Sequence, residues 1–503
     1  EVPLRALFES PTLAALAGRI DDLLLGKGDQ VEPPLVPAPR DRDLPLSFGQ
    51  QRLWFLDQLA PGSVTYTLPH TARLAGRQDL SALGAALSEI VRRHEVLRTT
   101  FDSRDGQPFQ VINAPWPVRV EVLDLRGLPE AEREVQRRQA MRTLLRQPWD
   151  LAHGPVLRAK LIQLADDDQV LVLTMHHIAA DGWSMAVLGQ ELATLYGAFR
   201  QGLPSPLPEL PLQYADFAVW QRNWLQGDVL QGQLTYWRNQ LADVPPLALP
   251  LDGPRPPVPR QRGGRVSFEV SGPLTELLHG LARQEGATTF MVLLAAFHAL
   301  LARYSGGDDI AVGTPIANRN RTEIEKLIGF FVNTLVIRIR LSGDPSFRQL
   351  LGRTREVCLA AYAHQDLPFE KLVEELQPTR DLSRQPLFQV MFTHQAGQQT
   401  AARAAASRAI RMGSDMEIAK FDLTLSITEM KDGMLGGLQY NADLFEEATA
   451  TRLVGHFLAI LGEAAASPER AVSDLAMMSP VERHEILVDW NETRVDFGGP
   501  ECA

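Results

Sequence analysis

The sequence predicts an α/β fold of two lobes, each mixing helices with strands. Apolar residues alternate between helical spacing and short strand-like runs from residue 46 to 220. The run 245–264 interrupts them with seven prolines and a Gly-Gly pair, which favours an extended crossing between two halves. The same alternation resumes at residue 265. We therefore expect two facing lobes with a ligand site at their interface.

The first half is predicted to alternate helices and strands. Leu83, Leu87 and Ile90 recur at helical spacing and indicate one buried helix face, whereas the run Val170–Leu173 is apolar on both strand faces. A strand that is apolar on both faces is typical of the middle of a sheet. The predicted helices are 48–59, 80–98 and 129–146. One predicted strand ends at 124–126, and two more cover 156–164 and 169–175.

The second half repeats this alternation. Its run 396–414 is rich in Ala, Gln and Arg, and we expect a loop there. The predicted strands are 265–270, 309–315, 332–341, 421–429 and 434–441, and the predicted helices are 272–284, 288–304 and 447–465.

The beginning of the chain differs from both halves. Residues 1–26 predict two short helices, the second beginning near Ser10-Pro11-Thr12. Residues 27–44 hold four prolines from Pro33 to Pro39 and predict a linker. We therefore place the first lobe at 45–220 and the second at 221–480.

Composition narrows the function. The formal net charge of −11 disfavours nucleic acid and anionic membranes as main partners. Only two cysteines are present and neither sits in a motif, which favours a reducing, cytoplasmic setting without disulfides. No apolar run has the length of a membrane span, and the beginning of the sequence lacks a signal-peptide pattern.

The segment Met175–Trp183 is the strongest candidate for a site. His176 and His177 follow a predicted strand, and Asp181-Gly182 precedes a helix that Ser184 is expected to cap. Because side chains alternate along a strand, one histidine is free for chemistry and the other for structure. Gly182 also allows an unusual backbone conformation and close approach of its N–H to a ligand. A structural role for both histidines is the competing interpretation.

Other site chemistries fit the sequence less well. No cysteine or acidic cluster is spaced to complete a metal shell with the histidine pair, so no metal is expected. No Gly-x-Ser-x-Gly elbow is present. The pair Gly306-Gly307 is followed by two aspartates, whose charge disfavours a phosphate-binding loop.

Seven motifs in order give the chain a resemblance to a known family. It resembles the condensation domains of nonribosomal peptide synthetases over about residues 44–480. The flanks agree: residues 2–12 and the helix after them resemble the end of a peptidyl carrier domain, and 481–503 resembles the linker toward an adenylation domain. The seven motifs are Leu46–Leu56, Arg93–Phe101, His176–Gly182, Tyr214–Trp220, Ile328–Thr334, His364–Glu370 and Arg380–Phe388.

The resemblance implies a fold and a reaction. The fold is similar to chloramphenicol acetyltransferase: two lobes in a V, with a tunnel between them. The reaction is peptide-bond formation, in which a donor acyl or peptidyl thioester moves from an upstream carrier to the amine of an aminoacyl thioester on a downstream carrier. The substrates ride on the 4'-phosphopantetheine of those carriers, and the carrier serine is not in this sequence. No other cofactor is implied, and we expect a monomer.

The resemblance also assigns residues. His177 matches the second histidine of the family motif and is expected to face the reacting amine, either as its general base or as a hydrogen-bonding partner. Gly182 is expected to offer its N–H to the developing oxyanion. His176 is expected to be structural. Asp181 is expected to form a supporting salt bridge, with Arg319 of the second lobe as its partner. The residues expected to line the tunnel are Trp183 and Asn333.

Relatives with other activities fit less well. Epimerisation domains usually lack the Gly182-Trp183 pair and are not normally followed by an adenylation linker. Heterocyclisation domains replace the first histidine with Asp, which His176 excludes. Noncatalytic recruitment domains tend to lose the motif, which is intact here. A stand-alone acyltransferase fits poorly with the carrier-like start of the chain.

Overall fold

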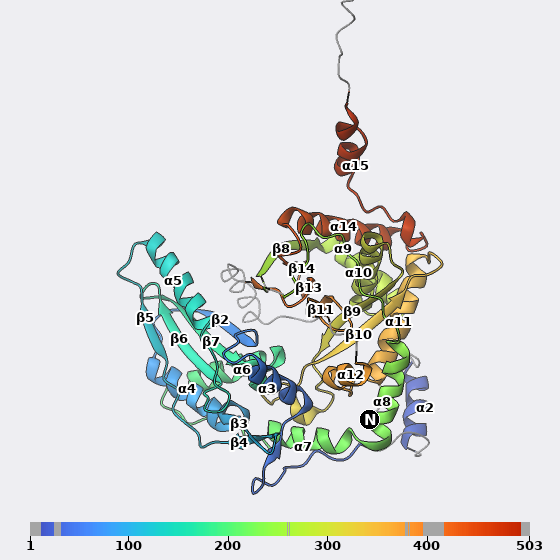
Figure 1. Ribbon diagram of the computed structural model, residues 1–503. Helices are drawn as coiled ribbons and strands as arrows, with labels where there is room; N and C mark the ends of the chain where they lie inside the picture. The colour runs from blue at the N-terminus through green and yellow to red at the C-terminus, as the bar shows by residue number, and fades with distance from the viewer. Residues whose placement is uncertain are drawn as a thin grey trace, which may run out of the picture.

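The predicted two-lobed α/β architecture is confirmed. The computed structural model describes residues 12–24, 32–258, 260, 262–377, 381, 383–395 and 417–493. Its elements gather around separate sheets in two lobes, joined at one end near α7 and apart at the other, as a V (Figure 1). The expected helix before residue 12, the expected loop 396–414 and the chain after 493 lie outside the described residues.

The first lobe contains two sheets. In the larger one, with strand order β2-β7-β6-β5, β7 pairs antiparallel with β2 and β6, and β5 runs parallel to β6. The smaller sheet has the order β1-β4-β3. The strands are β1 (Leu44–Pro45), β2 (Thr67–Ala75), β3 (Thr99–Arg104), β4 (Gln107–Ile112), β5 (Glu121–Asp124), β6 (Leu157–Gln163) and β7 (Asp168–His176).

Helices cover both faces of the larger sheet. Figure 1 shows α4 and α6 on one side of it and α5 on the other. The helices of this lobe are α3 (Phe48–Leu59), α4 (Leu80–Arg93), α5 (Glu130–Leu145), α6 (Gly182–Phe199) and α7 (Tyr214–Trp224), with 3-10 turns η1 (Glu95–Arg98) and η2 (His177–Ala179).

One predicted helix ends earlier than expected. The range 80–98 splits into α4 and η1 at His94, whose backbone is extended with φ −104 and ψ 100. The His94 Nε2 lies 2.9 Å from a carboxylate oxygen of Glu191 on α6. This buried contact between two helices accompanies the break at His94, which the helical spacing of apolar residues does not reveal.

The strand β7 is buried on both faces, as predicted. Leu171 and Leu173 belong to the core that holds the inner faces of α4 and α6. Val170 and Val172 face the other way and pack with Met141 of α5. Since both faces are covered, the end of β7 has a fixed position and direction, and the histidine pair begins there.

The second lobe is built around one sheet, whose strand order is β10-β9-β11-β13-β14-β8-β12. β11 runs parallel to β9 and β13, and the other pairs are antiparallel. The strands are β8 (Arg262–Ser271), β9 (Asp309–Ile316), β10 (Asn333–Arg340), β11 (Val390–Gln395), β12 (Glu417–Ile418), β13 (Leu423–Met430) and β14 (Gly433–Asn441).

The helix α10 lies at the centre of this lobe. All its residues from Met291 to Leu301 are buried, as expected for a helix that is apolar on every side. It packs against α11 and α14. The helices of this lobe are α8 (Gly227–Gln240), α9 (Gly272–Gln284), α10 (Thr289–Ser305), α11 (Phe347–Ala363), α12 (Phe369–Leu376) and α14 (Glu447–Ala466), with 3-10 turns η3 (Thr322–Ile324) and η4 (Val472–Asp474).

The lobes do not divide at one point of the chain. The predicted boundary at residue 220 falls inside α7, whose Tyr214 and Phe217 belong to the first-lobe core. The segment 317–332 leaves β9 of the second lobe, packs into the first-lobe core and returns to β10; we call it the crossing segment. Its core residues are Ile324, Leu327, Ile328 and Phe331.

Segments before and after the lobes extend over or away from them. The helix α2 (Leu13–Leu24) precedes the linker, and the linker is held to α7 by Trp220 Nε1, which donates to the Pro33 oxygen at 2.9 Å. At the other end, α15 (Pro480–Leu487) and the 3-10 turn η5 (Asp489–Asn491) project from the second lobe (Figure 1).

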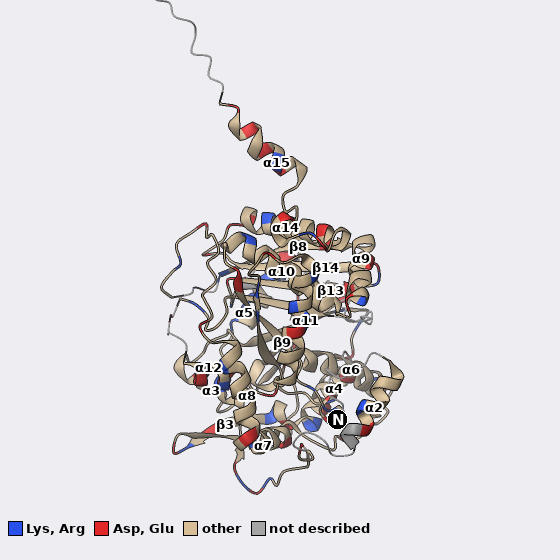
Figure 2. Ribbon diagram, turned by 90° about the vertical axis from the view of Figure 1, so that its right-hand side faces the viewer, with Lys and Arg blue, Asp and Glu red and all other residues tan. Residues whose placement is uncertain are grey.

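The surface carries charges of both signs. Lys and Arg residues are interspersed with Asp and Glu on the elements of both lobes (Figure 2). In the described part of the chain, no single helix is both long and apolar enough to cross a membrane. The helices α9 and α10 reach that length and apolar content only together, and the pair is bent by 104° at the break between them.

Candidate active site

The motif forms a strand, a tight turn and a helix. β7 ends at His176, η2 begins at His177, and Asp181 is the residue before α6. Asp181 caps this helix because its carboxylate accepts from the Ser184 N–H at 2.8 Å. The expectation that Ser184 caps the helix is therefore wrong. Asp181 is the cap, and Ser184, three residues further on, supplies the N–H that the Asp181 carboxylate accepts.

The neutral His177 ring is held in one tautomer. Its Nδ1 lies 3.1 Å from the carbonyl oxygen of Ala180. A carbonyl only accepts, so Nδ1 carries the proton and Nε2 keeps a lone pair. The ring is partly accessible, and within the described residues no partner of Nε2 is found. The pKa of His177 is lowered to about 3, mainly by burial and to a smaller extent by the charge of Lys420.

Neighbouring elements fix the position of this ring. The His177 N–H donates to the Tyr66 oxygen at 2.8 Å. The Phe330 ring lies 5.6 Å from the imidazole, edge to face. Gln50 on α3 donates from Nε2 to the Ile178 oxygen at 3.3 Å, which ties η2 to that helix. Three segments far apart in sequence therefore hold His177.

His176 has the opposite tautomer. Its Nδ1 accepts the Ile178 N–H at 3.1 Å, so Nε2 carries the proton of the neutral ring. The residue is buried, and its ring packs edge to face against Trp149. Burial, then the charge of Lys420, lowers the pKa of His176 to about 4. This ring stabilises the turn and is closed off from solvent.

Asp181 is surrounded by donors. Its Oδ1 accepts from the backbone and hydroxyl of Ser184 and from Arg319 Nη2, the last at 3.3 Å. Its Oδ2 accepts from the N–H groups of Phe331 at 3.0 Å and Val332 at 3.2 Å. Both oxygens of this buried carboxylate are therefore engaged by donors.

The expected contact between Asp181 and Arg319 is present, but Arg319 does not come from the body of the second lobe. It lies in the crossing segment, where its Nη1 donates to the oxygens of Ile324 at 2.6 Å and Leu327 at 2.7 Å. Burial lowers the pKa of Arg319, and Asp181 opposes that shift. The ion pair therefore holds the crossing segment to the first lobe.

Gly182 has an ordinary backbone conformation. Its φ is not among the positive values found for ten other glycines, so Gly182 does not use the unusual conformation that a glycine allows. A Cβ built at Gly182 would meet no atom within 4 Å, so the missing side chain leaves open space. Within the described residues its N–H, at the start of α6, has no acceptor.

The two residues expected to line a tunnel differ in exposure. Trp183 is 41% exposed, and its Nε1 donates to the Glu325 oxygen of the crossing segment at 2.8 Å. Asn333 is buried, and its amide donates to the oxygens of Gln365 and Leu367 and accepts the N–H groups of Thr334 and Phe369. With both donors and both lone pairs of the amide used, Asn333 clamps the loop before α12.

Lys420 and Tyr66 also lie at this site, although no pattern in the sequence points to either. The Lys420 ammonium is 4.7 Å from the centroid of the Tyr66 ring, and that ring is 6.5 Å from the His177 ring. Lys420 comes from the second lobe, just before β13, and Tyr66 from the first lobe, just before β2. Only the fold brings them together.

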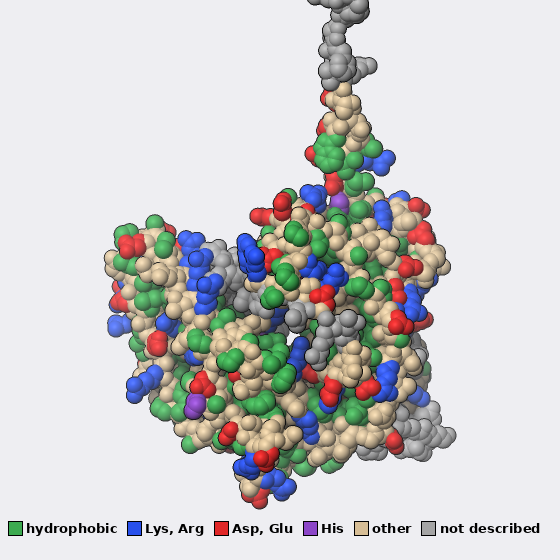
Figure 3. Space-filling view, viewed as in Figure 1, with side chains coloured by type: hydrophobic (Ala, Val, Ile, Leu, Met, Phe, Trp, Pro, Cys, Tyr) green, Lys and Arg blue, Asp and Glu red, His purple; other side chains and the backbone are tan. Residues whose placement is uncertain are grey.

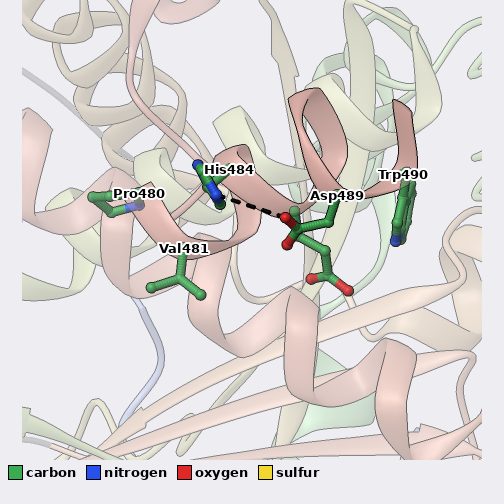
Figure 4. Close-up of a pocket in the computed structure, with 6 residues that line it drawn as sticks. Pro480, Val481, His484, Asp489 and Trp490 are labelled. Atoms are coloured by element: carbon green, nitrogen blue, oxygen red, sulfur yellow. Dashed lines mark ion pairs between the residues drawn. The ribbon is translucent and has the colours of Figure 1, made fainter. Parts of the chain in front are cut away.

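Two features of the described chain lie elsewhere. No group of three His, Cys, Asp or Glu residues among the described residues is arranged to hold a metal ion. One open hollow of about 460 Å³ lies on the C-terminal projection (Figure 4). It is lined by Pro480, Val481, His484, Glu485, Asp489 and Trp490. Figure 3 shows a separate notch between the two lobes, on the side away from α7.

Comparisons with known proteins agree on one family. A family model described as Condensation domain matches residues 40–487. A linear gramicidin synthase of Brevibacillus parabrevis is 48% identical over 506 residues, which make up 100% of this chain and 6% of that protein. The chain thus spans a small part of the length of that relative.

Solved structures share the fold. The X-domain in its complex with OxyB from teicoplanin biosynthesis matches with a TM-score of 0.79 at 32% identity, over 90% of this chain and 100% of that chain. The first condensation domain of the calcium-dependent antibiotic synthetase, in complex with a substrate analogue, matches with a TM-score of 0.73 at 22% identity, over 88% of this chain and 100% of that chain.

These matches confirm the family that the seven motifs indicate and its chloramphenicol-acetyltransferase-like fold. The family model covers both lobes, and the relative matches over the whole chain. The reaction of this family is peptide-bond formation in nonribosomal peptide synthesis. The chain therefore belongs to the condensation-domain family of the nonribosomal peptide synthetases.

Proposed function

We propose that the chain transfers a donor acyl or peptidyl group from an upstream carrier to an aminoacyl acceptor on a downstream carrier. Both substrates are thioesters of 4'-phosphopantetheine, and they meet at His177 in a tunnel between the lobes. Residues 1–26 are the end of the upstream carrier domain, and 481–503 leads to an adenylation domain. Because the chain matches 6% of its gramicidin synthase relative, these partners belong to a longer protein.

The single observation that carries this proposal is the free lone pair of His177. The Nδ1–H is engaged by Ala180, so Nε2 is left as an acceptor on a partly accessible ring. A neutral amine has N–H groups to donate and a lone pair to attack with. Binding through one N–H holds the amine while its own lone pair remains available for the donor carbonyl.

The reaction balances without a cofactor. The amine nitrogen attacks the donor carbonyl carbon, the C–S bond breaks, the peptide bond forms, and the pantetheine sulfur leaves as a thiol with a proton from the amine. A pKa of about 3 makes His177 a weak base at neutral pH. This favours His177 as the group that orients the amine over His177 as the group that removes its proton in full.

Gly182 and the Asp181–Arg319 pair have supporting roles in this proposal. The Gly182 N–H donates to the oxyanion that develops on the donor carbonyl. The open space beside Gly182 supports this role because a thioester needs room to approach that N–H. Asp181 and Arg319 keep the turn and the crossing segment in register, and His176 holds the turn from inside.

The test is transfer between separately supplied carriers. Donor carriers bear a panel of L-aminoacyl groups, acceptor carriers bear glycine or alanine, and mass spectrometry of the acceptor carrier records the dipeptide. We expect His177→Ala to reduce transfer by roughly 100-fold or more, since it removes an orienting group. His153→Ala on the exposed surface is the matched control and keeps transfer. Near wild-type transfer by His177→Ala with intact folding would remove His177 from the proposal.

A recruitment role is the second candidate, because the similar X-domain forms a complex with OxyB. The intact His176–Gly182 motif favours catalysis. The same assay separates the two: under recruitment alone, wild type yields no dipeptide with any loaded pair, and His177→Ala changes nothing. Under catalysis, wild type yields dipeptide with at least one pair and His177→Ala loses it.

A further inference from the structure

Lys420 belongs to the second lobe, but its side chain contacts the part of the first lobe that holds His176 and His177. It precedes β13, and its backbone oxygen accepts from Gln385 at 3.3 Å within its own lobe. Its ammonium lies over the Tyr66 ring, at 4.7 Å from the centroid. The same ring lies 6.4 Å from the His176 ring and 6.5 Å from the His177 ring. A positive charge therefore faces the proposed amine position from across the lobe interface.

This charge has no carboxylate partner among the described residues. Asp422, two residues further on, is paired with Arg255. Glu370 on α12 is paired with Arg52 on α3 at 3.0 Å. These two carboxylates are thus engaged by arginines, and the Lys420 ammonium lies over the face of the Tyr66 ring, a weaker partner than an anion.

Other charged and titratable groups around His177 do not offset Lys420. His176 is neutral, and Arg52, although paired, adds to the repulsion that Lys420 experiences. On the far side, Asp181 is engaged by Arg319 and backbone donors. The pKa of Lys420 is lowered to about 8, mainly by burial and to a smaller extent by the charge of Arg52. The Lys420 side chain is therefore mostly protonated at neutral pH. Lys420 in turn lowers the pKa of both histidines.

We propose that Lys420 is a positioning residue that makes the site select the neutral form of the acceptor amine. An ammonium acceptor would place a second positive charge beside Lys420 in a partly desolvated interface, whereas a neutral amine does not. The free α-amine, with a pKa of about 8, is mostly an ammonium at pH 7. On entering the site it gives its proton to solvent, and it then presents its lone pair to the donor carbonyl.

This inference rests on the proposed function, since it takes the acceptor amine to lie at His177. It explains why a strong base is not needed there. One unpaired positive charge nearby lowers the pKa of an amine by about one unit. This raises the ratio of neutral amine to ammonium about tenfold. His177 itself stays neutral without Lys420, because burial is the larger cause of its low pKa.

The first experiment measures proton release on binding. The probe is the glycyl amide of pantetheine amine, which has no thioester to hydrolyse and no side chain to fit. Calorimetry in buffers of different ionisation enthalpy counts protons at pH 6 and 7. At pH 7 we expect wild type and Lys420→Arg to release about 0.4 of a proton, the amount that a downward shift of about one unit from a pKa of about 8 gives, and Lys420→Met to release clearly less. At pH 6, Lys420→Met should bind the probe up to about tenfold more tightly, because the ammonium is no longer repelled.

Controls separate this effect from loss of structure. Lys431→Met removes a lysine charge from an exposed turn of the same lobe and should match wild type. The acetyl analogue of the probe has no amine and should bind wild type and Lys420→Met equally. Weaker binding of both probes to Lys420→Met would mean a structural role and would overturn the proposal, as would unchanged proton release.

The second experiment needs no ligand. Carbon and nitrogen NMR titration of the histidine rings should find the pKa of His177 raised in Lys420→Met and unchanged in Lys420→Arg. An unchanged pKa in Lys420→Met would overturn the proposal, because Lys420 would then exert no field at that ring. Either result stands whether or not a reactive substrate pair has been identified.

Transfer kinetics complete the test. The acid side of the pH–rate profile should move up by about one unit in Lys420→Met, with kcat and KM both lower at pH 6, and rates should converge near pH 9, where Lys420 itself is neutral. A uniform loss at all pH values contradicts the inference. If wild type yields no dipeptide with any loaded pair, the proposed function fails; if His177→Ala loses transfer and Lys420→Met matches wild type, this inference alone fails.

Discussion

The imidazole Nδ1 of His177 lies 3.1 Å from the carbonyl oxygen of Ala180, three residues further along the chain. This contact is local to η2, so the orientation of the ring is set by the same turn that follows β7. His176, one residue earlier, uses its Nδ1 in the opposite sense, as the acceptor of the Ile178 N–H. Two adjacent histidines thus carry their protons on different nitrogens.

The first prediction concerns these tautomers. Nitrogen NMR of ring-labelled protein at pH 7 should find His177 protonated on Nδ1 and His176 protonated on Nε2, because a carbonyl must accept and an N–H must donate. The remaining histidines serve as internal references in the same spectrum. Protonation of His177 on Nε2 would contradict the arrangement from which its acceptor role is argued.

The second prediction concerns the buried ion pair of Asp181 and Arg319. Asp181→Ala should lower the free energy of unfolding by about 3–5 kcal/mol, because it leaves a buried guanidinium without its anion. Arg319→Met should also destabilise, and the double variant should lose less than the sum of the two single losses. Chemical denaturation measures all three. Additive losses would mean that the two groups act separately.

The third prediction separates stability from activity at Gly182. Gly182→Ala should leave the free energy of unfolding within about 0.5 kcal/mol of wild type, since the new Cβ meets no atom and φ is ordinary. Transfer should nonetheless fall, because the methyl group occupies the space where the thioester approaches. Gly189→Ala, further along α6 and equally open, is the matched control for transfer. Full activity of Gly182→Ala would remove that space from the site.

The fourth prediction concerns Asn333. Asn333→Asp keeps the acceptor contacts to Thr334 and Phe369 but replaces two donors to the oxygens of Gln365 and Leu367. Two carbonyls then lack donors and face a carboxylate, so we expect a loss of about 2–4 kcal/mol. Hydrogen exchange should quicken in residues 365–369 first. Unchanged exchange there would mean that Asn333 does not hold this loop.

The fifth prediction concerns pH and stability. Burial holds His298, at the centre of α10, neutral with a pKa of about 4, below the ordinary value of 6.5. The unfolded chain therefore binds this proton first, and the free energy of unfolding falls as pH drops from 6.5 towards 4. Each such histidine contributes a slope of about 1.4 kcal/mol per pH unit in that window.

The variant His298→Leu isolates this contribution. Its unfolding free energy should fall less steeply between pH 6 and 4.5, by about the slope of one proton, while the difference from wild type stays constant above pH 7. Denaturant titrations at pH 5 and 7.5 measure both quantities. Parallel pH dependence in the two proteins would mean that His298 takes no part in acid destabilisation.

Much of the fold could be predicted because the patterns are local. The helix 48–59 and the helix 272–284 are found at the predicted residues, and the apolar run of β7 is buried on both faces. The predicted helix to residue 98 ends at Arg93 instead, with a cross-helix contact of His94 at the break. Apolar periodicity contains no information about such a contact.

The residues of the site also differ in whether a local pattern or long-range packing places them. The motif from His176 to Gly182 is contiguous, so its strand, turn and helix could be predicted together. Arg319 follows from the family resemblance, but its place in the crossing segment depends on long-range packing. Lys420 is one of four lysines in the second half of the chain and lies outside the seven motifs, and only the packing of one lobe against the other brings it near Tyr66.

The crossing segment has a mechanical consequence. Residues 317–332 belong to the second half by sequence but to the first lobe by packing, and the pair Asp181–Arg319 fastens them there. A motion that widens or narrows the V must therefore leave this segment with the first lobe and bend the chain at its two ends, near Ile316 and Asn333. The hinge of the molecule would then run beside the helix that begins at Gly182, so the angle between the lobes and the width of the space proposed for the two pantetheine arms would change together.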